Sequence, residues 1–221
     1  MIKFRHGFII LTVAALTATG CGPTMREYKG HVIFNSRYLF YLEASYRDEW
    51  QKPEEVLDAL KLPTNAIVAD IGAGGGYFTE KFAGRVGPGG RVYATDVQDA
   101  LLKKLRQRVA EHRLENVTVV HAAFDDPTLP EGACDLAFFS SVYKEIGNRA
   151  DYMRRLAKTL KPSGRVAILE YRMDVRAPGP PPKYRLPEEQ VIEEMTRAGF
   201  ALQERFDFLP REYFLVFGLG P

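Results

Sequence analysis

The amino-acid sequence predicts an α/β fold, a doubly wound and mostly parallel sheet of seven strands whose last strand is antiparallel. From Pro53 onward, amphipathic helical patterns alternate with short apolar runs that are typical of buried strands. One such run leads into the glycine-rich turn DIGAGGG at residues 70–76, directly before a helical pattern. The last two apolar segments, 201–209 and 212–219, are joined by too few residues for a crossover, so they must form an antiparallel hairpin.

The remaining elements follow one another along the chain. The helix expected at 77–86 ends before Gly87, and Asp99 is the expected cap of a long helix at 99–114. The proline-rich stretch 172–187 interrupts the alternation and is expected as a surface connection or as a loop over the carboxyl edge of the sheet. The other expected elements are strands 66–71, 91–97, 117–123, 134–142 and 164–171, and helices 53–62, 150–160 and 187–200.

Composition and charge limit what the chain can do. Its 221 residues, 46% of them hydrophobic, suit one domain with an extension. The net charge is +2 and the charged residues are interspersed, so we expect no nucleic-acid partner. Cys21 and Cys134 are far apart and unlike in context, which argues against a disulfide framework or a zinc site, and we expect no metal. The sequence leaves the oligomeric state open.

The first residues form a segment of their own. Lys3 and Arg5 precede an apolar run at 8–16, and small residues lead to Cys21. This pattern resembles a bacterial lipoprotein signal at residues 1–20, in which cleavage leaves Cys21 N-terminal and lipid-modified. The expected product is a membrane-anchored lipoprotein of the bacterial envelope. Two alternatives are an uncleaved membrane anchor and a translation start at Met25, which would make the protein cytoplasmic.

The glycine-rich turn predicts a nucleotide site. Glycines let the backbone approach a ligand, and the following helix offers unpaired amide groups. A dinucleotide fingerprint would need a third glycine where Tyr77 stands, and here the glycines alternate as Gly72, Gly74 and Gly76. Asp70 would repel a pyrophosphate, but it suits a ligand that carries an ammonium or sulfonium charge.

The chain resembles the class I S-adenosylmethionine-dependent methyltransferases from about residue 47 to 217. DIGAGGG resembles their motif D/E-x-G-x-G-x-G, and VYATDV places Asp96 at the end of the second strand. LKPSGRVAILEY resembles their LKPGG turn, with Ser163 in place of a glycine. The resemblance implies a Rossmann-like methyltransferase fold over 53–221 and S-adenosylmethionine as cofactor. It also implies that Asp96 accepts hydrogen bonds from the ribose hydroxyls.

The resemblance also carries roles to single residues. Many relatives have Gly-Asp-Ala after the third strand, where this chain has Ala122, Ala123 and Phe124, and its carboxylates follow at Asp125 and Asp126. We carry the adenine contact to Phe124 and Asp125. The cofactor-binding residues expected in this way are Asp70, Gly72, Ala73, Gly74, Gly76, Asp96, Val97, Phe124 and Asp125.

The methyl acceptor is expected near residues 143–145. Related sequences place a tyrosine and then histidine here, whereas this chain has Tyr143, Lys144 and Glu145, which become the catalytic candidates. The extension at 21–52 includes the aromatic stretch 38–50, which is either a lid or ordinary packing and which hints at a small, partly apolar acceptor.

Three functions follow from these observations. The first is methyl transfer to a small acceptor molecule. The second is a membrane-anchored, non-catalytic module that binds S-adenosylmethionine, an alternative raised because this donor is made in the cytosol. The third is a Rossmann oxidoreductase, which Tyr77 and Asp70 oppose.

Overall fold

The predicted sheet is confirmed by a computed structural model, which describes residues 25–36, 46–175 and 179–220. Seven strands form one sheet in the order β5-β4-β3-β6-β7-β9-β8. Strand β9 is antiparallel to both of its neighbours, and the pairs from β5 to β7 are parallel. The strands are β3 (Ile67–Ile71), β4 (Arg91–Asp96), β5 (Val117–His121), β6 (Cys134–Ser140), β7 (Leu160–Tyr171), β8 (Phe200–Phe206) and β9 (Glu212–Leu219).

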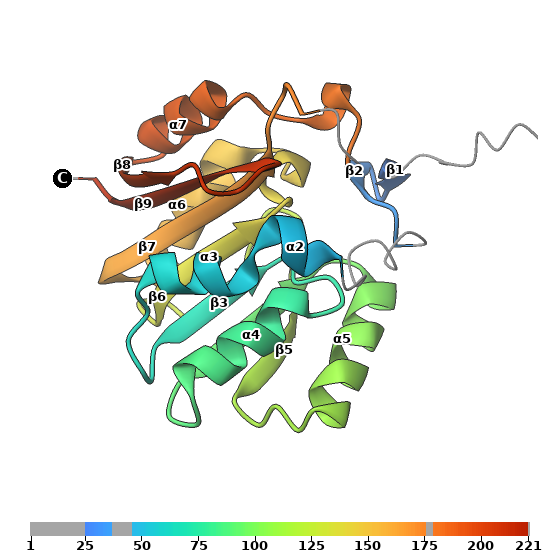
Figure 1. The fold of residues 1–221 in the computed structure, drawn as a ribbon, viewed down its shortest axis with the longest axis vertical. Helices are drawn as coiled ribbons and strands as arrows, with labels where there is room; N and C mark the ends of the chain where they lie inside the picture. The colour runs from blue at the N-terminus through green and yellow to red at the C-terminus, as the bar shows by residue number, and fades with distance from the viewer. Residues whose placement is uncertain (1–24, 37–45, 176–178, 221) are drawn as a thin grey trace, which may run out of the picture.

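Helices cover both faces of the sheet (Figure 1). Neighbouring strand residues point to opposite faces, so Val68 packs with α3 and α4, whereas Ala69 packs with α6 and α7. Helix α5 packs against β4 and β5 at one edge. These helices are α3 (Pro53–Leu60), α4 (Tyr77–Val86), α5 (Asp99–Glu111), α6 (Arg149–Thr159) and α7 (Glu188–Arg197).

Two boundaries differ from the expectation. Gln98, with extended backbone angles, is the residue that precedes α5, and Asp99 is the first helical residue, so the predicted Asp99 cap is wrong. Strand β7 begins at Leu160 and includes Pro162, because the strand starts directly after α6. The carboxyl end of β7 leads into the proline-rich connection, as expected.

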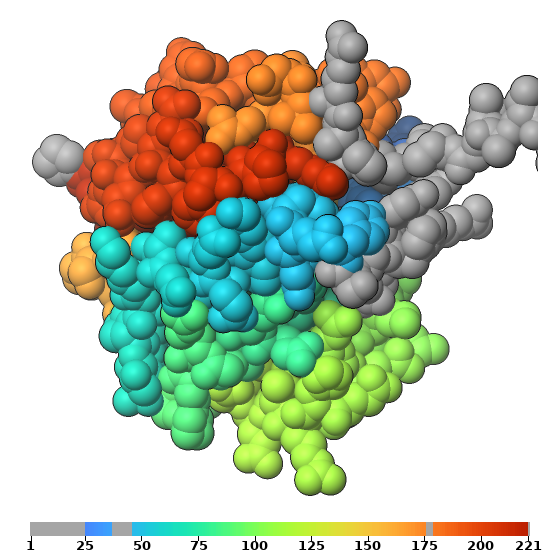
Figure 2. Space-filling view, viewed as in Figure 1, coloured from blue at the N-terminus to red at the C-terminus, as the bar shows by residue number. Residues whose placement is uncertain are grey.

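The segment before the first core helix contains structure that the sequence did not reveal. Strands β1 (Met25–Tyr28) and β2 (His31–Phe34) form an antiparallel hairpin, and a short helix α2 (Arg47–Gln51) precedes α3. Figure 2 shows α2 and α3 running along the C-terminal strands on the surface of the molecule. Cys21 and the expected signal lie outside the described residues.

No helix within residues 25–36, 46–175 and 179–220 has both the length and the apolar character needed to cross a bilayer.

The turn after β3 needs glycine for a steric reason. Gly72 has a φ of +65°, a left-handed conformation that side chains rarely adopt. A Cβ atom there would lie 2.5 Å from Cγ2 of Val142, in the loop that follows β6. The turn therefore packs directly against the neighbouring strand end, with no room for a side chain.

We expect Gly72→Ala to lower the free energy of unfolding by about 1–3 kcal/mol, because it adds left-handed strain and a contact with Val142. Gly84→Ala is the matched control, since Gly84 lies on α4 with open space around its Cα and should gain about 0.4–1 kcal/mol. Urea denaturation of both variants measures the difference. Equal stability of the two variants would contradict this account of the turn.

Candidate active site

A cavity of about 500 Å³ opens at the carboxyl ends of β3, β4 and β6. This volume lies within the range of small-molecule sites, and the edge is where open α/β sheets bind ligands. The wall is mainly apolar, with a few charged groups at separate places. Asp70 and Asp96 lie at what we call the first end of the cavity, and Arg47 lies at the second end.

Two buried carboxylates lie at the first end, on neighbouring strands. Asp70, the residue before the last of β3, has 3% of its surface exposed, and Asp96, the last residue of β4, has 6% exposed. Thr79, on the first turn of α4, donates a hydrogen bond of 2.6 Å to Oδ2 of Asp70. Burial raises the pKa of Asp70 to about 6, which the bond from Thr79 and the charge of Arg47 oppose.

Asp96 holds the glycine-rich turn in place. Its Oδ2 accepts a bond of 3.1 Å from the backbone N–H of Gly74, and its Oδ1 accepts one of 2.8 Å from that of Gln98. Burial raises the pKa of Asp96 to about 6 in spite of these bonds. A carboxylate has about four lone-pair sites, so Asp96 keeps acceptor capacity for a hydroxyl group of a ligand.

The other predicted cofactor residues divide into two groups. Gly72, Ala73, Gly74, Val97 and Phe124 line the cavity with the two acids. Gly76 is outside the lining and precedes α4 with a φ of +91°.

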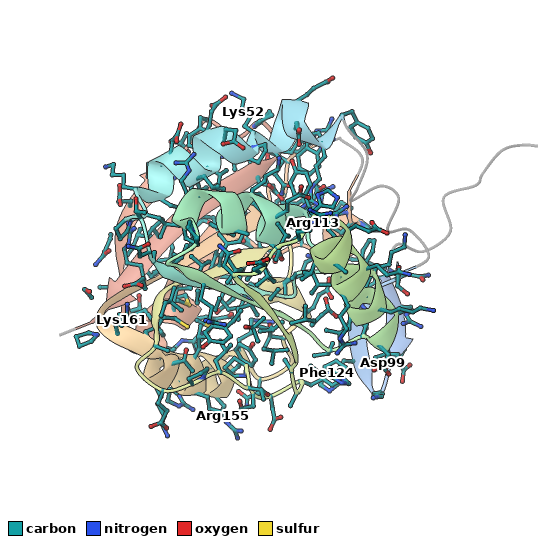
Figure 3. The ribbon with its side chains drawn as sticks, turned by 90° about the horizontal axis from the view of Figure 1, so that it is seen from below. Lys52, Asp99, Arg113, Phe124, Arg155 and Lys161 are labelled. Carbon is teal, nitrogen blue, oxygen red and sulfur yellow. The ribbon has the colours of Figure 1, made fainter. Side chains whose placement is uncertain are left out.

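Asp125 does not lie at the cavity with its neighbour. Its side chain is exposed, and Oδ2 lies 3.5 Å from Nη1 of Arg155 on α6. Phe124 lies next to the N-terminal hairpin, as Figure 3 shows, and its ring stacks on His31 with 3.9 Å between centroids. The loop therefore turns one residue of the predicted pair toward the cavity and the other toward solvent.

Of the three catalytic candidates, two line the cavity and one does not. Tyr143 is fully buried, and its hydroxyl donates to Glu194 on α7, away from the cavity lining. Lys144 and Glu145 both line the cavity. The Lys144 ammonium lies 3.3 Å from Oε2 of Glu170 and donates to the carbonyl of Ser141.

Glu145 combines burial with a hydrogen bond to the hairpin. Its Oε2 accepts a bond of 2.9 Å from the backbone N–H of Phe34. Burial raises the pKa of Glu145 to about 7, and the Lys144 charge opposes this. Phe34 also accepts a bond from Gln98 through its carbonyl, so the end of β2 connects Glu145 with the residue that precedes α5.

Sequence reasoning missed a polar network at the second end. Arg47 and Gln51 of α2 are buried and line the cavity, and Nε of Arg47 donates to Oε1 of Gln51. Gln51 donates bonds of 2.8 Å to Glu212 and 3.0 Å to Ser140. The available signal was the spacing of four residues between Arg47 and Gln51, which places both on one face of a helix.

Glu212 lies beneath this network and is fully buried at the start of β9. It accepts a second bond, of 3.0 Å, from Ser141. Burial raises the pKa of Glu212, and the bond from Gln51 opposes the shift. Trp50 and Tyr171 complete the wall, with ring centroids 5.8 Å apart.

The proline-rich connection lies at this end of the cavity. This confirms the expectation of a loop over the carboxyl edge of the sheet. Gly179 and Pro180 line the cavity, and the Cα of Gly179 packs against the Tyr171 ring. Arg185 fixes the connection through bonds of 2.7–2.8 Å to the carbonyls of Arg172, Val175 and Pro180.

Comparison with known proteins agrees with this geometry. Residues 68–164 match the family model described as a methyltransferase domain. The chain is 30% identical over 123 residues to the ubiquinone/menaquinone biosynthesis C-methyltransferase UbiE of Proteus mirabilis, a match that covers 55% of this chain and 49% of that protein. It is 33% identical over 110 residues to UbiE of Ectopseudomonas mendocina, covering 49% and 43% respectively. The matches thus span about half of these curated relatives.

A solved structure extends the likeness over most of the chain. The S-adenosylmethionine-dependent methyltransferase from Aquifex aeolicus superposes with a TM-score of 0.81 at 25% identity, covering 84% of this chain and 98% of that one. The strand order, the glycine-rich turn between two buried acids and these matches agree. Residues 68–164 therefore match a methyltransferase domain, in a fold similar to that of an S-adenosylmethionine-dependent methyltransferase.

Proposed function

We propose that the protein transfers a methyl group from S-adenosylmethionine to a small, partly apolar acceptor with an aromatic ring and an oxygen substituent. The observation that carries this proposal is that two buried acids, Asp70 and Asp96, share one cavity with an aromatic wall. The acids suit the donor, and the wall suits the acceptor. Both reactants would therefore meet in a single enclosed space.

The residues at the first end fit the donor. The left-handed turn leaves backbone amides close to the ligand, and Gly72 has no space for a side chain. Asp96 accepts from the ribose hydroxyls, and Asp70 faces the positive charge of the methionine part. The bound donor supplies an activated methyl group, so that the bond from sulfur to carbon breaks as the bond from acceptor to carbon forms and S-adenosylhomocysteine leaves. The protein needs to align the two reactants and to exclude water.

The second end supports an aromatic acceptor. Trp50 and Tyr171 offer flat apolar surfaces, and Arg211 lies 4.8 Å from the Trp50 ring centroid. Trp50 lines the cavity, and its buried indole N–H has no hydrogen-bond partner among the described residues, so this wall keeps an unused donor. The relatives named above are C-methyltransferases of quinone biosynthesis, and this favours a ring carbon as the atom that receives the methyl group.

Glu145 is the general base in this proposal. When a ring carbon takes the methyl group, it must lose its proton, and the base receives that proton after the new bond has formed. Tyr143 points to Glu194, and Lys144 already binds Glu170 and Ser141. Glu145 lies in the cavity with a pKa of about 7, which suits a base at neutral pH.

A transfer assay with methyl-labelled donor and a panel of phenols, naphthols and quinols tests the function. We expect label in the ring of at least one acceptor and release of S-adenosylhomocysteine. Donor binding with no turnover on any acceptor would instead support the non-catalytic module. Absence of donor binding would overturn the proposal as a whole.

Glu145→Gln should lower kcat about a hundredfold or more, while donor affinity stays within about threefold. Glutamine still accepts a bond from Phe34 but cannot take a proton at neutral pH. In the wild type, kcat should fall as the pH drops through about 7, because protonated Glu145 is inactive as a base. A glutamine variant with wild-type turnover would contradict the assignment.

Donor affinity should fall as the pH drops below about 6. Asp70 and Asp96 have pKa values of about 6 in the free protein, and a cationic donor favours their ionised forms, so binding at lower pH must displace protons. Calorimetry in two buffers of different ionisation enthalpy measures the proton release. Asp96→Asn, which cannot titrate, should bind more weakly and with a shallower pH slope. An affinity that is constant from pH 5 to 8 would disprove this linkage.

We also propose that the protein is a lipoprotein anchored at Cys21, on the sequence pattern of residues 1–21. Cys21→Ser should then abolish incorporation of a labelled lipid precursor and release the chain from the membrane fraction. Unchanged labelling in the mutant would contradict the anchor. An N-terminal peptide that begins at Met25 would show a later translation start instead.

A further inference from the structure

The candidate binding groups follow one another along the carboxyl edge of the sheet. Phe124 follows β5, Asp96 ends β4, Asp70 is the residue before the last of β3, and Ser140 ends β6. These four strands are consecutive neighbours in the sheet. S-adenosylmethionine has its own order of adenine, ribose, sulfonium and amino acid. If Asp96 holds the ribose and Phe124 lies near the adenine, the amino acid extends past β3 toward β6. The part of the wall between Asp70 and Ser140 therefore faces the end of the donor.

Arg47 occupies this part of the wall. It is 7% exposed, it lines the cavity, and its guanidinium carbon lies 3.9 Å from the centroid of the Tyr77 ring on the first turn of α4. Through Gln51 it is connected to Ser140 at the end of β6. Arg47 and Asp70 also interact electrostatically, since the charge of each favours the charged form of the other.

The amino acid of the donor carries an ammonium and a carboxylate on one carbon atom. A site that places an anion at the ammonium must therefore offer a cation or N–H donors only a few ångströms away, or leave a buried carboxylate uncompensated. Asp70 supplies the anion, and Arg47 supplies a planar cation with several N–H donors on the adjacent wall. The opposite charges of the two side chains match the opposite charges of the amino acid.

The geometry points to Arg47 as the residue that binds the carboxylate of the donor, an inference that rests on the proposed function. Neither the match over residues 68–164 nor any motif in the sequence assigns this role. Glu212 and Gln51 are positioning residues in this arrangement. Glu212 accepts from the Gln51 amide, so the Gln51 carbonyl is directed to Nε of Arg47, and the guanidinium is fixed against Tyr77.

Two ligands that differ in the amino acid alone test the role. S-adenosylhomocysteine carries it, and 5′-methylthioadenosine keeps the adenosine and the thioether without it. With the full chain purified in detergent, titration calorimetry on Arg47→Met should show S-adenosylhomocysteine bound about ten- to a hundredfold more weakly. The affinity for 5′-methylthioadenosine should stay within about threefold of the wild type.

Two further variants make the comparison decisive. Asp96→Asn should weaken both ligands, because both contain the ribose. Arg47→Lys keeps the charge but loses the fork of N–H groups, so S-adenosylhomocysteine should bind with intermediate affinity. This variant also carries the test if Arg47→Met fails to fold, as circular dichroism would show.

The outcomes separate the inference from the function. Equal losses for both ligands in the Arg47 variants would show a structural role, and an unchanged affinity for S-adenosylhomocysteine would show no contact with the carboxylate. Either result overturns the inference and leaves the proposed function standing. A wild-type protein that binds neither ligand removes both.

Discussion

The structure of the site depends on the attachment of the glycine-rich turn to the end of β4. The backbone N–H of Ala73 donates to the carbonyl of Thr95 at 2.8 Å, and that of Gly74 donates to the Asp96 carboxylate at 3.1 Å. Both bonds require β3 and β4 to pair in the observed parallel register, in which Ile71 lies opposite Thr95. On the other side, Gly72 packs on Val142 beyond β6. The turn is therefore fixed by its two neighbouring strands before any ligand binds.

This attachment has an electrostatic cost that the remaining fold must offset. Asp70, Asp96 and Glu212 are buried at one edge, Glu145 beside them is 12% exposed, and burial raises the pKa of each. Two apolar layers, one on each face of the sheet, supply the stabilisation that allows such a cluster. A ligand that carries positive charge relieves part of the cost when it enters the cavity. Because a cationic ligand stabilises the ionised form of these acids, the free-energy cost of burying them favours the binding of such a ligand.

The parts predictable from sequence are those whose signal lies within a few consecutive residues. Asp70 and Asp96 lie at the carboxyl ends of apolar strands, and the alternating glycines follow the first of them directly, so a local pattern located all of them. The same holds for the sheet and most helices. Asp125 lies one residue beyond Phe124, but the loop turns its side chain to Arg155, and loop direction has no such local pattern.

The network of Gln51 with Glu212 spans 161 positions in the chain, so no spacing rule connects the two residues. The N-terminal hairpin was missed for a related reason. Its two strands have four residues each, which is too short for an alternating pattern to stand out.

The family match covers the first end of the cavity better than the second. The family match covers residues 68–164, which contain Asp70, Asp96 and the glycine-rich turn that form the donor end. Much of the other end is built outside that range, from α2, from Tyr171 at the end of β7 and from the connections around β9.

Arg47 has a place in both ends, since it lies beside Asp70 and is held by Glu212 through Gln51. The matched range thus contains the two acids and the glycine-rich turn, whereas Arg47 and the aromatic wall of Trp50 and Tyr171 come from the outer segments. The identity of the acceptor has to be sought in the shape and charge of those outer segments, because they form the wall that it would contact.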